Sequence, residues 1–399
     1  MNIVFLVNRY PGVGGIENMT TLLSCLFKLE LGYETSIFSI VGQEGIIVDP
    51  IIKQNGIDVQ IVNSEVTEEN KSLIVKQFKD FLLRKNPDVV IFQDSYAPIE
   101  FLLYAIKDDS RFSNIKICTV EHNTPDCLLK GYIEHWKKHS LRSLGGLSRK
   151  LLFPYVYHKI LSQNKCRHKK LVEFSDKYIL LSSSYKKILK NLYNIDDPNI
   201  TAIANIKNDF IDVERTNRCL DKKEVLLFVG RLNSQKGIDK LIDVWRVLGK
   251  RIPAYELVIV GDGEERELLE QAMATHDLKN IRLEGFKNNV SDYYQEASAI
   301  LMTSIFEGLP LVLAEAMQFG VVPFAYDTFS SLHDIIDHHK TGYIIKPFNV
   351  GEYAESVCAF LNLPEASKKK MRHEAMKKSE KFSKSCILNQ WKDLLENEL

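Results

Sequence analysis

The chain has 399 residues, of which 45% are hydrophobic and 26% are charged, and its formal net charge is zero. This length exceeds one ordinary core and suits two domains of roughly 150–200 residues each. The balanced charge gives no overall field that would favour nucleic acid as a partner.

The cysteines and the N-terminus indicate the cellular compartment. The seven cysteines are scattered and form no CxxC pair, a pattern that predicts reduced thiols in a cytosolic protein and not a disulfide framework or a zinc site. No apolar run approaches the roughly 20 residues that span a bilayer. The opening MNIVFLVNRYPG lacks a basic stretch before its apolar run, so we expect a first strand there and not a signal peptide.

Short apolar runs alternate with helix-period segments along the whole chain. This alternation predicts an α/β protein with doubly wound parallel sheets. A helix is expected at 237–251, where one face carries Ile238, Leu241, Ile242, Trp245 and Leu248. The predicted strands are 2–7, 34–40, 88–93, 115–121, 178–182, 225–230, 255–261, 281–285, 299–304, 321–327 and 342–346.

The order of elements restarts in the middle of the chain. Residues 2–17 and 225–248 both read as strand, turn and helix, and a polar, turn-rich stretch lies between them. We therefore predict an N-terminal domain at 1–210 and a C-terminal domain at 211–380. Because ligands of such sheets bind outside the carboxyl ends of the strands, the expected site is a cleft between the domains.

One basic segment stands apart from this pattern. Residues 136–170 contain ten Lys or Arg and no acidic residue. Apolar side chains interleave with these charges, namely Leu151, Leu152, Phe153, Val156, Ile160 and Leu161. Such a stretch can lie on an anionic membrane surface, where each basic residue contributes about 1 kcal/mol. The alternative is a solvated helical face of the N-terminal domain.

Two glutamates lie at the start of a predicted apolar helix. Glu307 precedes Gly308, Leu309 and Pro310, and a proline suits the first turn of a helix, whose free amides can bind an anion. Glu315 lies within the apolar run LVLAEAM. Two hydroxyl-binding carboxylates beside an anion site suit a nucleotide diphosphate sugar. The alternative for Glu307 is an ordinary charge at a helix start, and the alternative for Glu315 is a solvent-facing residue. The apolar neighbours of Glu315 argue against the second alternative.

Two further turns could contribute to the same chemistry. The strand that ends at Gly230 is followed by Arg231 and Lys236, two cations that could hold a diphosphate. The N-terminal turn contains Gly14 and Gly15, which would let the backbone approach a ligand closely. This turn has neither GxGxxG nor GxxxxGK[ST] spacing, and the alternative is an ordinary tight turn.

The histidines give weaker signals. His122 follows a predicted strand, and a lone histidine of this kind can be structural or functional. The stretch HDIIDHH, with His333, His338 and His339, matches no metal-binding spacing, so we expect it on the surface. The chain contains no Asp-x-Asp pair, which argues against a sugar transferase built around a bound metal.

Together these residues resemble the family-four retaining glycosyltransferases, which have the GT-B fold of two Rossmann-like domains. The resemblance covers nearly the whole chain and is strongest over 225–345. It rests on the glutamate pair in FEGLPLVLAEAM, on VGRLNSQKG and LVIVGDGEERELLE, on GGIE, and on the histidine of TVEHNTP. The closing FSKSCILNQWKDLL resembles the helix, at about 380–399, that packs back onto the N-terminal domain in this fold.

The resemblance implies a role for each matching residue. The donor diphosphate would be bound by Arg231 and Lys236, and the ribose hydroxyls by Glu315. The transferred sugar would contact Glu307 and the amides near it. Gly230 would lie at the start of the turn that binds the diphosphate, and Gly14 and Gly15 would lie near the phosphates. Phe286 or Lys287 would lie near the base, and His122 near the sugar and the acceptor. The implied positions at the helix start are Gly308, Leu309 and Pro310.

The implied reaction is transfer of a sugar with retention at the anomeric carbon, from a nucleotide diphosphate sugar, with UDP barely favoured over GDP. The leaving diphosphate would help deprotonate the acceptor hydroxyl, with no metal and no other cofactor. We expect an acceptor that is a glycan or lipid-linked saccharide of a bacterial envelope polysaccharide, and a cytoplasmic protein that can bind the inner face of the membrane. The alternatives are a nucleotide-sugar epimerase or phosphorylase on the same fold, or a non-catalytic subunit.

Overall fold

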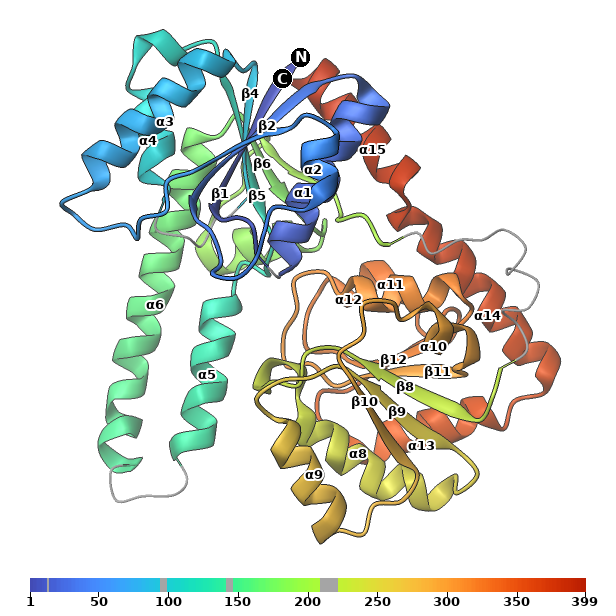
Figure 1. Ribbon diagram of the computed structural model, residues 1–399. Coiled ribbons are helices and arrows are strands. Elements are labelled where there is room, and N and C mark those ends of the chain that lie inside the picture. Colours follow the sequence, from blue (N-terminus) through green and yellow to red (C-terminus); the bar gives the residue numbers. More distant parts are fainter. Residues whose placement is uncertain (13, 94–98, 141–145, 209–221) are drawn as a thin grey trace. The chain divides into compact units, whose positions relative to one another are not determined.

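The computed structural model describes residues 1–12, 14–93, 99–140, 146–208 and 222–399, apart from some side chains within 134–151. The chain divides into two compact units (Figure 1). Unit 1 comprises Met1–Ala204 with Leu388–Leu399, and unit 2 comprises Asn205–Ile387. The predicted domain boundary at 210/211 lies outside the described residues.

Unit 1 is built on a seven-stranded sheet in which every strand pair is parallel, with the order β3-β2-β1-β4-β5-β6-β7. The order reverses between β1 and β4, as in doubly wound folds. The central strands are almost wholly apolar because helices cover both faces of the sheet. The strands are β1 (Asn2–Arg9), β2 (Glu34–Val41), β3 (Asp58–Ile61), β4 (Val89–Phe92), β5 (Lys116–Glu121), β6 (Lys177–Leu180) and β7 (Ile200–Ala202).

The helices of unit 1 connect these strands. They are α1 (Gly15–Leu31), α2 (Pro50–Gln54), α3 (Lys71–Lys85), α4 (Phe101–Lys107), α5 (Cys127–Ser140), α6 (Gly146–Phe174) and α7 (Tyr185–Ile188). In Figure 1, α5 and α6 run side by side and extend away from the sheet of this unit. The end of the chain also packs here, since Trp391 contacts the ring of Phe27 at 5.6 Å between centroids and Tyr33 donates to Glu396 at 2.6 Å.

Unit 2 contains a six-stranded parallel sheet with the order β10-β9-β8-β11-β12-β13. Its strands are β8 (Val225–Val229), β9 (Glu256–Val260), β10 (Ile281–Gly285), β11 (Ala299–Met302), β12 (Val322–Tyr326) and β13 (Tyr343–Ile345). Its helices are α8 (Ile238–Arg251), α9 (Arg266–Thr275), α10 (Ser291–Glu296), α11 (Leu311–Gln318), α12 (Leu332–Ile335), α13 (Val350–Leu361), α14 (Glu365–Ser379) and the start of α15 (Lys384–Asp393).

The structure confirms the predicted α/β class with two parallel sheets, and each predicted strand is present within a few residues of its expected ends. The five apolar residues predicted on one face of α8 are all buried. The strands β3 and β7 were not predicted. Both are short and lie at the edges of their sheet, where an interrupted apolar run is tolerated.

In the parts of the chain that the structure describes, every helix is too short or too polar to cross a membrane.

Candidate functional site

Two loops at the carboxyl edge of the unit 2 sheet are joined to each other. Strands β8 and β11 are neighbours in the sheet, so the loops that follow them, 230–237 and 303–310, emerge side by side. The Ile305 amide donates to the Gln235 carbonyl at 2.8 Å, and Gln235 Nε2 donates to Phe306 O at 3.1 Å. Thr303 Oγ1 donates to Lys236 O at 3.0 Å. These bonds fix the two loops as one surface.

Glu307 and Lys236 form an ion pair on this surface. Lys236 Nζ lies 2.7 Å from Glu307 Oε1. Their side chains are 19% and 9% exposed, so both charges are largely removed from water but can still be reached. The structure therefore brings together two residues that are 71 positions apart and that the sequence predicts for one site.

The loop conformation around Lys236 depends on glycine. Gly237 has a φ of +66°, and a Cβ there would collide with the Thr303 carbonyl of the neighbouring loop. Gly230 lies against the aliphatic stem of Lys236, since an added Cβ would be 3.4 Å from Lys236 Cε. Arg231 follows as an exposed side chain, for which the described residues provide no recorded ion pair or hydrogen bond.

Helix α11 begins directly after this surface. Pro310 is its N-cap rather than a first-turn residue, and the buried Leu309 anchors the entry to the helix. Ser331 Oγ donates to Gly308 O at 2.6 Å, which fixes the preceding turn. The first-turn amides of a helix have no partners within the helix, so this end of α11 can accept negative charge.

Glu315 lies in the second turn of α11 and is 9% exposed. Its Oε1 accepts a bond of 2.8 Å from Asn208 Nδ2, and its Oε2 accepts one of 3.2 Å from the Tyr294 hydroxyl. Burial raises the pKa of the Glu315 carboxyl, and these hydrogen bonds oppose the rise. The alternative of a solvent-facing Glu315 is therefore wrong. Oε1 also accepts a bond of 3.4 Å from the Asn208 amide, so Oε2 is the oxygen that keeps a lone pair for a ligand hydroxyl.

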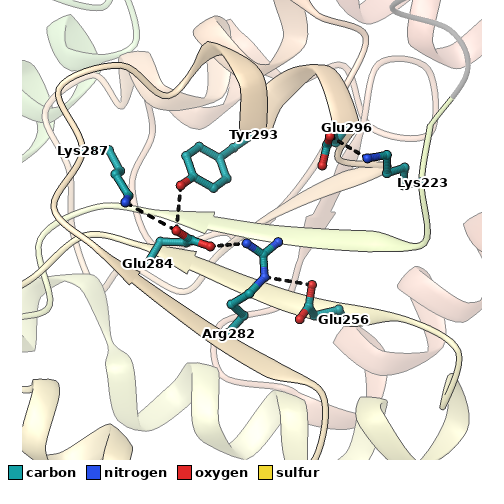
Figure 2. A network of polar contacts seen from close by, with 7 residues as sticks. All are labelled: Lys223, Glu256, Arg282, Glu284, Lys287, Tyr293 and Glu296. Atoms are coloured by element: carbon teal, nitrogen blue, oxygen red, sulfur yellow. Dashed lines mark hydrogen bonds and ion pairs between the residues drawn. The ribbon is translucent and has the colours of Figure 1, made fainter.

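Phe286 and Lys287 follow β10 at the same edge of the sheet. Phe286 is 67% exposed. Lys287 belongs to a polar network that Figure 2 shows, in which Glu284 accepts from Lys287 at 3.5 Å and from the Tyr293 hydroxyl at 2.8 Å. Arg282 pairs with Glu284 and, at 3.1 Å, with Glu256 of β9. The network fixes the end of β10 and leaves Phe286 beside it as an open aromatic face.

The other predicted site residues belong to unit 1. Gly14 is the N-cap of α1, and an added Cβ at Gly15 would meet no atom of the described residues within 4 Å. His122 follows β5, and its Nε2 lies 2.5 Å from Oε1 of the buried Gln93. Burial of the imidazole lowers the pKa of His122 to about 4, so the ring is neutral at pH 7.

A buried polar cluster beside His122 was not predicted from the sequence. The Tyr178 hydroxyl donates to Glu121 Oε2 at 2.8 Å and lies 2.9 Å from Nδ1 of His168. The Nε2 atom of His168 lies 3.1 Å from the Pro125 carbonyl oxygen. Burial lowers the pKa of His168 to about 3. The cluster joins α6, β6 and the turn after His122, and the only sequence signal was the glutamate at the end of an apolar strand.

The predicted surface histidines take local structural roles. His333 pairs with Asp327 at 2.9 Å, and His338 Nδ1 accepts from the Ile344 amide at 2.9 Å. Across the described ranges, no group of three or more His, Cys, Asp or Glu side chains could hold a metal ion.

The C-terminal part of the chain is similar in sequence to a known family. Residues 211–381 match the family model described as glycosyl transferases group 1. This part of the chain is similar to that family, and the match leaves out residues 1–210. It contains the ion pair of Lys236 and Glu307 together with Glu315, Phe286 and Lys287.

Two curated relatives extend the comparison. An uncharacterized glycosyltransferase of Haemophilus influenzae is 31% identical over 221 residues, which are 55% of this chain and 61% of that protein. The amylovoran biosynthesis glycosyltransferase AmsD of Erwinia amylovora is 30% identical over 226 residues, 55% of this chain and 62% of the relative. The chain thus spans about three fifths of the length of these two relatives.

A solved structure covers the whole chain. The crystal structure of Anabaena HepE in complex with UDP matches with a TM-score of 0.73 at 15% identity, over 99% of each chain. At this identity the likeness concerns the fold, and it confirms the predicted GT-B class of two Rossmann-like domains.

Proposed function

We propose that this protein is a retaining glycosyltransferase. It moves a sugar from a nucleotide diphosphate sugar, with UDP as the preferred nucleotide, to a saccharide or lipid-linked acceptor in the synthesis of a bacterial surface polysaccharide. The family match of residues 211–381 and the relative named for amylovoran biosynthesis support the transferase class. The UDP complex of a protein with the same fold supports the choice of nucleotide.

The observation that carries the proposal is the pair of Lys236 and Glu307 on two joined loops. A diphosphate that binds beside Lys236 would compete with Glu307 for the ammonium group, which frees the carboxylate to accept sugar hydroxyls. Arg231 and the N-terminus of α11 add positive character where charge develops on the leaving oxygen. In this reading Glu315 holds the ribose hydroxyls, and His122 lies by the sugar and the acceptor.

These cations perform the task that a metal performs in other transferases, so we propose that transfer needs no metal and no other cofactor. The test is a thermal-shift and hydrolysis screen of UDP- and GDP-linked sugars, with and without EDTA. We expect one UDP-sugar to stabilise the protein and to release nucleotide at a rate that EDTA leaves unchanged. A response to GDP-sugars alone would contradict UDP as the preferred nucleotide. A loss of rate in EDTA would contradict the proposal that transfer needs no metal. The absence of a response to every nucleotide sugar would contradict the transferase assignment.

We also propose that the basic segment 136–170 binds the inner face of an anionic membrane, where lipid-linked acceptors reside. Leu152 and Tyr155 on α6 are 56% and 67% exposed. Lys159 and Lys165 follow on the same helix and are exposed as well, whereas the Phe153 ring packs against Tyr132, 5.5 Å between centroids. Each basic residue near such a surface contributes about 1 kcal/mol.

Flotation with vesicles tests the membrane contact. Wild-type protein should float with phosphatidylglycerol vesicles at low salt and not with pure phosphatidylcholine, and binding should fall at 0.5 M salt. The double variant Lys159→Glu/Lys165→Glu should lose binding. The matched control Lys186→Glu/Lys187→Glu alters two other exposed lysines of unit 1 and should bind like wild type. If binding does not depend on salt, or if both double variants weaken it equally, the proposed membrane contact of this segment is refuted.

A further inference from the structure

A cavity of about 580 Å³ lies in unit 1, and none of the candidate site residues named above lines it. It opens at the carboxyl ends of β1, β2 and β3, which are consecutive in the sheet. Its volume falls in the range of roughly 300–1,000 Å³ that small-molecule sites occupy. Polar groups and the backbone of three segments line it, namely Asn8 and Arg9 at the end of β1, Gly42 and Glu44 after β2, and Asn63 and Glu65 after β3.

The walls of this cavity are held by the backbone. The Tyr10 amide donates to Val41 O at 2.8 Å, and the Gln43 amide donates to Pro11 O at 2.9 Å. The segment after β3 forms the third wall, and at its start the Val62 amide donates to Ser39 O at 2.9 Å. Asn63 then takes a left-handed conformation with a φ of +56°, which asparagine tolerates better than most residues. The cavity is therefore formed before any ligand arrives.

Five of the six polar side chains that line the cavity make no hydrogen bond or ion pair with the described residues. Among the described residues, the structure records no hydrogen bond or ion pair for the side chains of the five polar residues Asn8, Arg9, Glu44, Asn63 and Glu65. Two amides, one guanidinium and two carboxylates can donate to and accept from several hydroxyl groups at once. One cation against two carboxylates leaves a negative balance, which disfavours a phosphate group.

We propose that this cavity binds a neutral sugar unit of the acceptor and does not bind a polyol phosphate. The link to the acceptor rests on the proposed transferase function, whereas saccharide binding itself does not. The cavity supplies hydrogen-bonding groups from three loops around one opening at the carboxyl edge of the sheet, where ligands of doubly wound domains bind.

Gly42 offers a way to block the cavity without changing the polar side chains that line it. A Cβ at Gly42 would lie 3.6 Å from Asn63 Oδ1, an ordinary contact, and the backbone there is not left-handed. Gly42→Ala should therefore be tolerated, and Gly42→Leu should extend into the cavity beside Asn63. As a second pair, Glu65→Gln removes a carboxylate of the cavity, and Glu69→Gln makes the same change at an exposed position outside it.

The experiment measures binding of a panel of methyl hexosides and methyl N-acetylhexosaminides by saturation-transfer NMR, with glycerol 3-phosphate as the anionic probe. At least one glycoside should bind, and Gly42→Leu should weaken its affinity more than tenfold, whereas Gly42→Ala stays within about twofold. Glu65→Gln should weaken it about tenfold and Glu69→Gln should not. Circular dichroism and the melting temperature establish that each variant is folded.

Several results would overturn the proposal: no glycoside binds, binding is equal in wild type and folded Gly42→Leu, or glycerol 3-phosphate binds in preference to every glycoside. Hydrolysis of the donor sugar, measured in the same samples, separates this inference from the transferase function. Donor hydrolysis should be unchanged in all four variants. Hydrolysis without saccharide binding refutes the cavity assignment alone, and saccharide binding without hydrolysis refutes the transferase assignment alone.

Discussion

The ion pair of Lys236 and Glu307 gives the sharpest test of the proposed site. In Lys236→Met the ammonium is removed, while a side chain of similar length still covers Gly230. Glu307 then keeps its charge at a position where only 9% of the side chain is exposed. Breaking a fully buried pair in this way costs about 3–5 kcal/mol. Because Lys236 itself is 19% exposed and water can reach the pair, we expect a smaller loss of about 1–3 kcal/mol in the free energy of unfolding.

The loss of activity should exceed what this destabilisation can explain. Removing one group that stabilises a leaving oxygen typically costs about 100- to 1,000-fold in kcat, or about 3–4 kcal/mol. At 25 °C an enzyme that loses 3 kcal/mol from a usual stability of about 5–15 kcal/mol is still almost wholly folded. The fraction of folded protein therefore changes little, and the fall in kcat reports on the chemistry.

A double variant separates the two effects. In Lys236→Met/Glu307→Gln both charges are gone, so the free energy of unfolding should return to within about 1 kcal/mol of wild type. The rate should not recover, because the group that faces the diphosphate is still absent. The assay is release of nucleotide from the preferred donor, with kcat and KM determined for wild type, both single variants and the double variant, alongside urea denaturation of each.

Two outcomes would refute this reasoning. If Lys236→Met retains kcat within about threefold of wild type, Lys236 does not stabilise the leaving group. If the double variant recovers both stability and rate, the ion pair serves the fold and not the reaction.

Three further predictions concern stability. Because burial raises the pKa of Glu315, the native state binds this proton more tightly than the unfolded chain does. The free energy of unfolding of wild type should therefore fall, relative to that of Glu315→Gln, as the pH rises above about 4.3. Denaturation between pH 4 and 8 checks this, and a difference between the two proteins that does not change with pH would contradict it. Burial lowers the pKa of His168 to about 3, so its ring stays neutral in the native state until the pH falls to about that value. The free energy of unfolding should therefore decline by up to roughly 4 kcal/mol from pH 6.5 towards pH 3. In the same titration His168→Gln should lose less stability at acid pH than wild type does. Gly261→Ala should destabilise by more than about 3 kcal/mol, because φ is +146° and its Cβ would collide with the Gly230 carbonyl, while Gly351→Ala in α13 should leave the melting temperature near that of wild type.

The sequence predicts elements best where burial determines the residue pattern. The interior strands β1, β8 and β11 are continuous apolar runs because helices cover both faces of each sheet, and α8 shows its buried face as a regular spacing of Ile, Leu and Trp. The edge strands β3 and β7 escape prediction because a strand with one neighbour can be short and polar.

Tertiary partners leave weaker traces in the sequence. Glu315 stands out as a charge within an apolar helix, but its partners are a polar residue 107 positions earlier, Asn208, and a tyrosine 21 positions earlier, Tyr294. Neither is distinguishable from an ordinary surface residue by composition or spacing. The burial of both carboxylate oxygens depends on how α10, α11 and the chain before β8 pack together, which no local pattern records.

The position of the candidate catalytic charges depends on the same kind of hidden contact. Lys236 and Glu307 meet because β8 and β11 are neighbours, although β9 and β10 lie between them in sequence. The two loops then need a second set of bonds, from Gln235 and Thr303, to hold the charges 2.7 Å apart. Charged residues in the loops are visible as motifs because their chemistry restricts their type. The residues that join the loops act through one amide or one hydroxyl each, and many residue types could supply that bond, so only the structure identifies them.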